Sequence, residues 1–101
     1  MPASERERCV RLRIEGHVQG VGYRYWVKQK AQGSGLRGWV RNRRDATVEA
    51  ILAGPAGLVG DMIAACERGP VSARVAAVTI VQEDADQSSL PGAGIEMRPT
   101  V

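Results

Sequence analysis

Apolar and polar residues alternate from Cys9 to Glu15, where Val10, Leu12 and Ile14 are separated by charged side chains. A period of two is the pattern of a strand that buries one face and leaves the other in water. Three glycines within residues 16–22 then interrupt the pattern and allow positive φ at several points, which predicts a loop. The chain therefore begins with a half-buried strand that leads into an irregular, glycine-rich segment.

Two segments carry apolar residues at helical spacing. The first runs from Tyr23 to about Gln32, and the glycines at 33 and 35 supply its stop. The second begins after Gly54, with Pro55 suited to its first turn, and ends at Arg68-Gly69-Pro70. Its apolar stripe at i, i+3, i+4 and i+7 consists of Val59, Met62, Ile63 and Cys66.

The remaining apolar runs predict four more strands. Only Arg43 to Ala46 separate the first two of these, so we expect them to form a hairpin. The third is long and rich in β-branched side chains, and the last is short. The predicted strands span residues 36–42, 47–53, 71–83 and 95–98, with a polar loop over 84–94.

The order of elements predicts the fold class. Strand, helix, strand, strand, helix, strand is the order of the ferredoxin-like α+β sandwich. We expect an antiparallel sheet of four strands plus a short fifth, with two helices on one face. Residues 9–101 are assigned to this single domain and residues 1–8 to a disordered N-terminal extension.

Composition narrows the class of protein. A chain of 101 residues with 44% hydrophobic and 25% charged residues is typical of one soluble globular domain. No stretch approaches the roughly 18 apolar residues of a membrane span, and the start of the chain lacks an export signal, so we expect no membrane association and a cytoplasmic location. Cys9 and Cys66 are too few for a disulfide framework and predict free, buried thiols.

Charge is distributed unevenly along the chain. The formal net charge is +3, but residues 1–44 carry a net charge of +8 and residues 45–101 a net charge of −5. Positive and negative charges are usually mixed more evenly on a surface without functional bias. An anionic partner is therefore expected to bind the first half of the chain.

The glycine-rich loop is a candidate anion site because it connects a strand to the start of a helix. The first N–H groups of a helix have no internal partner, and glycines allow neighbouring N–H groups to point the same way. The spacing of Gly16, Gly20 and Gly22 is not that of a Walker A loop. The loop alone is equally compatible with a tight structural turn.

Arg24 favours the anion site. A cation in the first turn of a helix is destabilised by the helix dipole, typically by ~0.3–1 kcal/mol. A bound anion there makes the position of the cation favourable. Arginine also grips two phosphate oxygens at once. The alternative is an exposed arginine that solvent screening tolerates.

Two further polar residues near the loop have competing interpretations. Asn42, at the end of a predicted strand, is either a turn former or an amide that holds a water beside a bound phosphate. His17 is the only histidine, and an exposed loop position is favoured over a catalytic one because no carboxylate is placed to orient it. Trp26 and Trp39 have apolar neighbours and are interpreted as core residues.

Together these segments resemble the acylphosphatase family. Residues 16–24, Gly-His-Val-Gln-Gly-Val-Gly-Tyr-Arg, are similar to its phosphate-binding signature, and residues 38–45, Gly-Trp-Val-Arg-Asn-Arg-Arg-Asp, to its second signature. The likeness extends over residues 10–98. It implies a ferredoxin-like enzyme that hydrolyses small acyl phosphates to a carboxylate and inorganic phosphate, with no metal and no other cofactor.

The resemblance also implies residue roles. It assigns phosphate binding to Arg24 and orientation of the attacking water to Asn42. The expected phosphate cradle consists of the backbone of Gln19, Gly20, Val21, Gly22 and Tyr23. The chain departs from the family pattern at Ala46, where a glycine is usual, at Ser34, where a leucine is common, and over residues 84–94, which are difficult to align. If position 46 requires positive φ, alanine costs on the order of 1 kcal/mol there.

The chemistry of an acyl phosphate suits the few reactive groups of this sequence, which has no evident metal cluster or Ser/His/Asp set. An acyl phosphate expels a carboxylate, whose conjugate acid has a pKa of about 4, so the leaving group departs without a general acid. Charge neutralisation and a positioned water then suffice.

Two other functions are partly compatible with the sequence. A module that binds RNA or single-stranded nucleic acid fits the fold and the basic first half, but the first strand lacks the aromatic residues that would stack on bases. An accessory domain of a larger carbamoyl-transferring enzyme is less favoured because the chain stands alone. We therefore expect a monomer whose partners are a small acyl phosphate and its phosphate product, and no nucleic acid.

Overall fold

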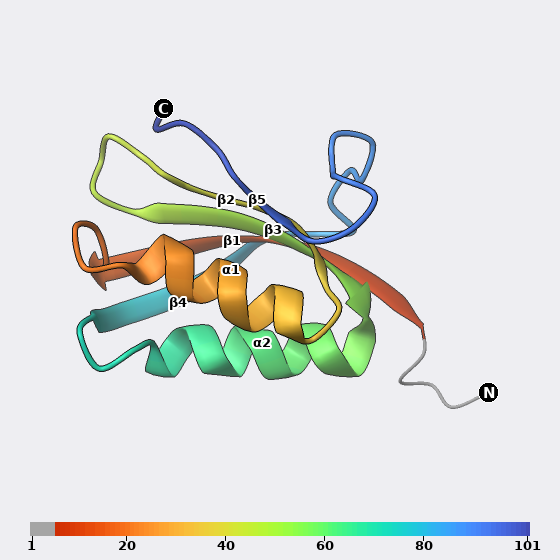
Figure 1. The fold of residues 1–101 in the computed structure, drawn as a ribbon, viewed down its shortest axis with the longest axis horizontal. Helices are drawn as coiled ribbons and strands as arrows, with labels where there is room; N and C mark the ends of the chain where they lie inside the picture. Colours follow the sequence, from red (N-terminus) through yellow and green to blue (C-terminus); the bar gives the residue numbers. More distant parts are fainter. Residues whose placement is uncertain (1–5) are drawn as a thin grey trace.

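Two helices lie on one face of a five-stranded sheet in the computed structural model, which describes residues 6–101 (Figure 1). The strand order is β4-β1-β3-β2-β5. The predicted ferredoxin-like α+β sandwich is confirmed. The elements are β1 (Glu7–His17), α1 (Tyr23–Gly33), β2 (Arg37–Asn42), β3 (Val48–Pro55), α2 (Ala56–Arg68), β4 (Arg74–Glu83) and β5 (Ile95–Met97).

The sheet is mixed. The first four strands pair antiparallel, as predicted, whereas β5 runs parallel to β2 and pairs Val40 with Met97. Because β4 and β5 occupy opposite edges, the chain between them must cross the sheet. The segment 84–94 makes this crossing and does not close a hairpin.

Several strand boundaries differ from the prediction, since β1 continues through Gly16 and His17 of the predicted loop and β3 continues to Pro55, which was predicted to open the second helix. β1 begins at Glu7, and Glu7 and Arg8 pair with the end of β3, so these two residues belong to the folded domain and not to the predicted extension. Residues 1–5 of that extension lie outside the described residues. β4 begins at Arg74, three residues later than predicted, because the N–H of Ala73 donates to the Pro70 carbonyl at 3.0 Å and forms a turn.

The main core lies between the sheet and the helices. The alternating apolar positions of β1 face it and pair with buried positions of β3, for example Leu12 with Ala50. Each helix contributes its predicted stripe, with Val27 and Met62 among the buried residues. Trp26 packs against the edge of this core.

A second, smaller core covers the opposite face of the sheet. It consists of Cys9, Trp39, Ile51, Ala53 and Ala85, with Leu90 packed against it. The crossing segment 84–94 supplies the last two of these residues, so this face is only partly open to water. Trp39 is 3% exposed, and the Arg41 and Arg98 guanidinium groups lie 4.6 and 5.0 Å from its ring centre. Its position confirms a core residue and leaves no ring face free for base stacking.

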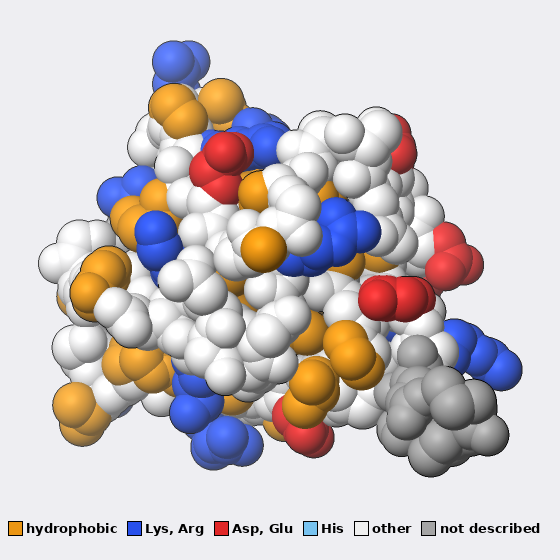
Figure 2. All heavy atoms as spheres, turned by 45° about the vertical axis from the view of Figure 1, so that its right-hand side comes forward, with side chains coloured by type: hydrophobic (Ala, Val, Ile, Leu, Met, Phe, Trp, Pro, Cys, Tyr) orange, Lys and Arg blue, Asp and Glu red, His pale blue; other side chains and the backbone are white. Residues whose placement is uncertain are grey.

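The opposite charges of the two halves of the sequence are mixed in space. Figure 2 shows Lys and Arg side chains interspersed with Asp and Glu side chains on the face turned to the viewer. Strand pairing causes this mixing, since β3 from the acidic half lies between the basic strands β1 and β2. On the face that Figure 2 shows, the net charge of +8 in the first half therefore does not form a separate patch.

The state of the two cysteines and the length of the helices match what the composition predicted. Cys9 and Cys66 are buried and free, as predicted. Burial raises the pKa of the Cys66 thiol to about 11, which keeps it protonated near neutral pH. Neither helix of residues 6–101 has the length and apolarity that crossing a membrane requires.

Candidate active site

Three segments that are distant in the sequence meet at one end of the sheet. They are the glycine-rich loop before α1, the β2–β3 hairpin loop and the end of the chain after β5, all at the left of Figure 1. A cavity of about 130 Å³ lies here. Arg24 and Asn42 line the same cavity, together with Gly20, Gly22, Val18 and Tyr23. The structure thus brings together the two residues that the sequence analysis singled out.

The glycine-rich loop has the backbone geometry of an anion cradle. Gly20 and Gly22 have φ of 75° and 78°, values that favour glycine. Gly22 is the N-cap of α1, which has no side-chain cap. Within the described chain, none of the N–H groups from Gln19 to Tyr23 donates to a backbone carbonyl. The loop therefore offers several adjacent donors at the positive end of a helix dipole.

Two side chains hold this loop to its neighbours. The Gln19 Nε2 donates to the carbonyl oxygens of Arg43 and Thr47, each at 2.8 Å. The Ser72 Oγ donates to the Val21 carbonyl at 2.9 Å. Because the Gln19 amide bridges both ends of the hairpin loop, it links the two sequence signatures physically.

Arg24 is the second residue of α1. The first turn of this helix contains no acidic residue. Among residues 6–101, the Arg24 guanidinium has no hydrogen-bond acceptor and no ion-pair partner. Its positive charge therefore faces the cavity and the helix dipole without a protein counter-charge.

Asn42 is the last residue of β2, and its side chain lies on the helix side of the sheet. Its Oδ1 is buried and accepts no hydrogen bond from any described residue. Its backbone carbonyl accepts the N–H of Val101 at 3.3 Å, and the N–H of Arg44 donates to the Val101 carbonyl at 2.8 Å. The end of the chain thus holds the strand end from which Asn42 projects, and the buried Oδ1 has no hydrogen-bond partner among the described residues.

The hairpin loop after Asn42 is shaped by Asp45. Its carboxylate accepts hydrogen bonds from the N–H and the hydroxyl of Thr47, at 3.0 and 2.6 Å. Ala46 between them has a φ of 76°, in the left-handed region. The position where the family usually has glycine therefore does require positive φ in this chain.

A buried carboxylate fixes the other face of the same hairpin. Glu49 is 7% exposed and accepts hydrogen bonds from Arg41 Nε at 2.8 Å, from Arg43 Nη1 at 3.0 Å and from Arg11. Burial alone would raise the pKa of this carboxyl, but the three guanidinium groups hold it below its usual value. Since Arg41 and Arg43 flank Asn42, this ion cluster anchors the strand end opposite the cavity.

Val18, Tyr25 and Met97 line the cavity although they were not among the predicted site residues, whereas Gln19 and Val21 of the predicted cradle are not part of its lining. Tyr25, next to Arg24, and Met97 of β5 both line the cavity. The position of Tyr25 beside Arg24 was an available signal, whereas nothing in the sequence pattern predicts that β5 pairs with β2. His17 ends β1, is exposed and is not part of the cavity lining, in agreement with the non-catalytic interpretation.

The chemistry that the cavity offers is that of anion binding. Its one charged lining residue among residues 6–101 is Arg24. In the same part of the chain, no three His, Cys, Asp or Glu side chains are grouped as a metal site would require. The groups available are therefore backbone N–H donors, one guanidinium and one carboxamide.

Comparison with known proteins identifies the family. A sequence model of the acylphosphatase family matches residues 10–92. The chain is 51% identical to an acylphosphatase of Nitrobacter hamburgensis over 90 residues, covering 87% of this chain and 91% of that protein. It is also 51% identical to one of Bradyrhizobium diazoefficiens over 94 residues, covering 91% and 95%.

A solved structure agrees with the sequence match. The crystal structure of acylphosphatase from Bacillus subtilis superposes with a TM-score of 0.78 at 31% identity, covering 92% of this chain and 99% of that chain. With the fold, the cavity and both signatures in place, the chain belongs to the acylphosphatase family, enzymes that hydrolyse acyl phosphates.

Proposed function

We propose that this enzyme binds the phosphoryl group of its substrate in the glycine-rich loop and hydrolyses it with a water held by Asn42. The observation that carries the proposal is that Arg24 and Asn42, from separate elements, line one cavity at the N-terminus of α1. Backbone donors from Gln19 to Tyr23 and the unpaired Arg24 guanidinium would neutralise the phosphate oxygens. The affinity for phosphate thus comes from one side chain and from the loop backbone.

The free acceptor of Asn42 supports its assigned role. A buried polar atom without a partner costs roughly 1–3 kcal/mol, and a water that donates to Oδ1 removes that cost. Held there, the water oxygen attacks phosphorus while the bond from phosphorus to the acyl oxygen breaks. The bonding electrons leave with the carboxylate, and a phosphate oxygen takes the proton of the water.

The leaving group explains why so few groups are sufficient. A carboxylate whose conjugate acid has a pKa of about 4 departs without protonation. The transition state for phosphoryl transfer is loose, so bond formation to the water lags and little base strength is needed. Charge stabilisation by fixed donors is then the main requirement. We expect hydrolysis to proceed in the presence of a chelator.

The test separates binding from turnover. With acetyl phosphate and excess chelator, Arg24→Ala should lose at least about 100-fold in kcat/KM, the scale expected for losing one oriented donor. Inorganic phosphate should also inhibit it more weakly. Asn42→Ala should lower kcat on a similar scale and keep the phosphate inhibition constant, because its side chain contacts the water and not the phosphate.

The matched control is Lys28→Ala, which removes a cation one turn further along α1 and outside the cavity lining. We expect its kcat/KM to stay within about threefold of wild type, since distant charges only steer the anion. Full activity in a folded Arg24→Ala protein would contradict the residue assignment. A folded wild type without acyl phosphate hydrolysis would contradict the proposed function.

A further inference from the structure

The cavity is too small to enclose an acyl phosphate that has a large acyl group. Its volume of about 130 Å³ is below the roughly 300–1,000 Å³ of pockets that enclose a drug-sized molecule. If the phosphate lies against the loop donors, as proposed above, a large acyl group must extend out of the cavity. The residues at the rim therefore decide which acyl groups bind well.

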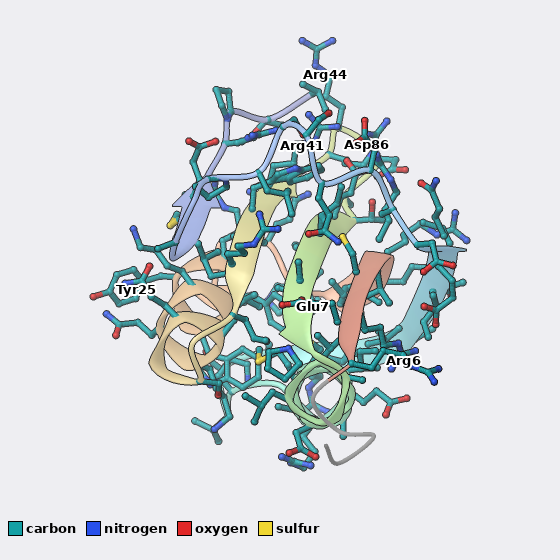
Figure 3. The ribbon with its side chains drawn as sticks, turned by 90° about the vertical axis from the view of Figure 1, so that its right-hand side faces the viewer. Arg6, Glu7, Tyr25, Arg41, Arg44 and Asp86 are labelled. Atoms are coloured by element: carbon teal, nitrogen blue, oxygen red, sulfur yellow. The ribbon has the colours of Figure 1, made fainter. Side chains whose placement is uncertain are left out.

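Two apolar side chains form this rim. Tyr25 is 57% exposed and Met97 is 38% exposed, although both line the cavity. A residue that both lines a cavity and is open to solvent lies at its mouth. Figure 3 shows Tyr25 projecting from α1 towards solvent. The other large exposed apolar side chains among the described residues, such as Leu58 of α2 and Val81 of β4, do not line the cavity.

The rim is ordered. Gln29, one helical turn after Tyr25, donates its Nε2 to the Tyr25 hydroxyl at 2.5 Å. Met97 belongs to β5, which is hydrogen-bonded to β2, the strand that carries Asn42. Both side chains are therefore positioned by the elements that position the two proposed catalytic residues.

We infer that Tyr25 and Met97 bind the acyl group and make the enzyme select acyl phosphates whose acyl group is apolar and large, above all aryl. An aromatic ring and a flexible thioether both favour flat apolar surfaces. A charge on the acyl group adds little to the affinity. Arg24 is the single charged lining residue among residues 6–101, and it is engaged by the phosphate. The inference rests on the proposed function, since it requires the phosphate to occupy the loop.

The experiment compares kcat/KM for benzoyl phosphate with that for acetyl phosphate. These substrates differ in intrinsic reactivity, so the decisive quantity is the change in their ratio between variants. Tyr25→Ala and Met97→Ala should each lower the ratio about 5- to 10-fold, within the range expected for losing apolar contacts in a binding pocket. Any change in kcat/KM for acetyl phosphate or in the inhibition constant of inorganic phosphate should be smaller than the change in kcat/KM for benzoyl phosphate, because neither of these ligands presents a large apolar group to the rim.

Two controls accompany these variants. Tyr25→Phe keeps the ring and should keep the ratio, which separates apolar contact from the hydroxyl. Leu58→Ala removes an exposed apolar side chain far from the cavity and should also keep it. An unchanged ratio in both Tyr25→Ala and Met97→Ala, with acetyl phosphate still hydrolysed, overturns this inference alone. Failure of the wild type to hydrolyse either substrate overturns the proposed function and the inference together.

Discussion

Ala46 is the residue whose backbone is least suited to its side chain. Its φ of 76° places the Cβ in a region that glycine adopts freely and alanine does not. The sequence pattern predicted the turn, and the family resemblance drew attention to the alanine and its conditional cost. Neither predicted the unpartnered Oδ1 of Asn42, four residues earlier, because the surroundings of Asn42 include the glycine-rich loop and Met97, which are distant in the sequence. The conformation of a residue in a local turn can be predicted from its sequence neighbours. The hydrogen-bonding environment of a side chain that is buried by tertiary contacts cannot.

Ala46→Gly should raise the free energy of unfolding by about 1 kcal/mol, because glycine relieves the left-handed strain at this position. Urea denaturation followed by circular dichroism measures the change. The matched control is Ala64→Gly at an exposed position of α2, where the same substitution should lower stability by about 1 kcal/mol. Effects of the same sign at both positions would show that position 46 carries no strain.

At the scale of elements, β2 connects the cavity to the second core. Asn42 points to the cavity side, while Trp39 and Arg41 lie on the opposite face with Glu49. Residue periodicity predicted this strand and its hairpin partner. It also predicted the short last strand and the loop 84–94, but not that β5 pairs parallel with β2 or that the loop crosses the sheet, since both are placed by the surfaces they cover and not by their own pattern. The same reason explains Glu7 and Arg8, whose strand conformation comes from pairing with β3.

The ion cluster of β1, β2 and β3 predicts acid sensitivity. The pKa of Glu49 is lower in the folded protein than its usual value of 4.5, so its contribution to stability is present above that value and is lost as the pH falls through the folded-state pKa. Glu49→Gln should lower the free energy of unfolding near pH 7 by about 2 kcal/mol, the scale of hydrogen bonds to charged groups. Its stability should also fall less than that of wild type below about pH 4.5.

Urea denaturation at several pH values from 3 to 7 measures both effects of the Glu49 substitution. Glu67→Gln, at an exposed position of α2, is the control and should follow the wild-type curve. Parallel curves for wild type and Glu49→Gln would show that the cluster does not contribute to the acid response.

At the scale of the whole molecule, charge along the sequence is a poor guide to charge in space. The excess of +8 in the first half suggested an anionic partner, but three of its arginines, Arg11, Arg41 and Arg43, instead form ion pairs with Glu49 across neighbouring strands. The prediction of a small anion came from the glycine-rich loop and Arg24. These residues are close together in the sequence, so their pattern can be recognised without the fold. The rim residues and the cavity volume required the assembled fold.

Inorganic phosphate should stabilise the whole domain, because it binds the folded loop and not the unfolded chain. At 100 times its Kd, the expected gain is about 2.7 kcal/mol, enough to raise Tm by several degrees. This stabilisation is measured as the difference in Tm between thermal unfolding in phosphate and thermal unfolding in chloride at equal ionic strength. Arg24→Ala should show a clearly smaller shift. Equal shifts in both proteins would mean that phosphate acts on the surface in general.

The proposed phosphate cradle also has a consequence for protein design. Most of its donors are main-chain groups, so the information that specifies them is a set of dihedral angles between a strand and a helix. Grafting this anion receptor onto another scaffold would mean copying the path of residues 16–24, with glycines where φ is positive, and keeping an apolar contact for Val21, which packs against the core.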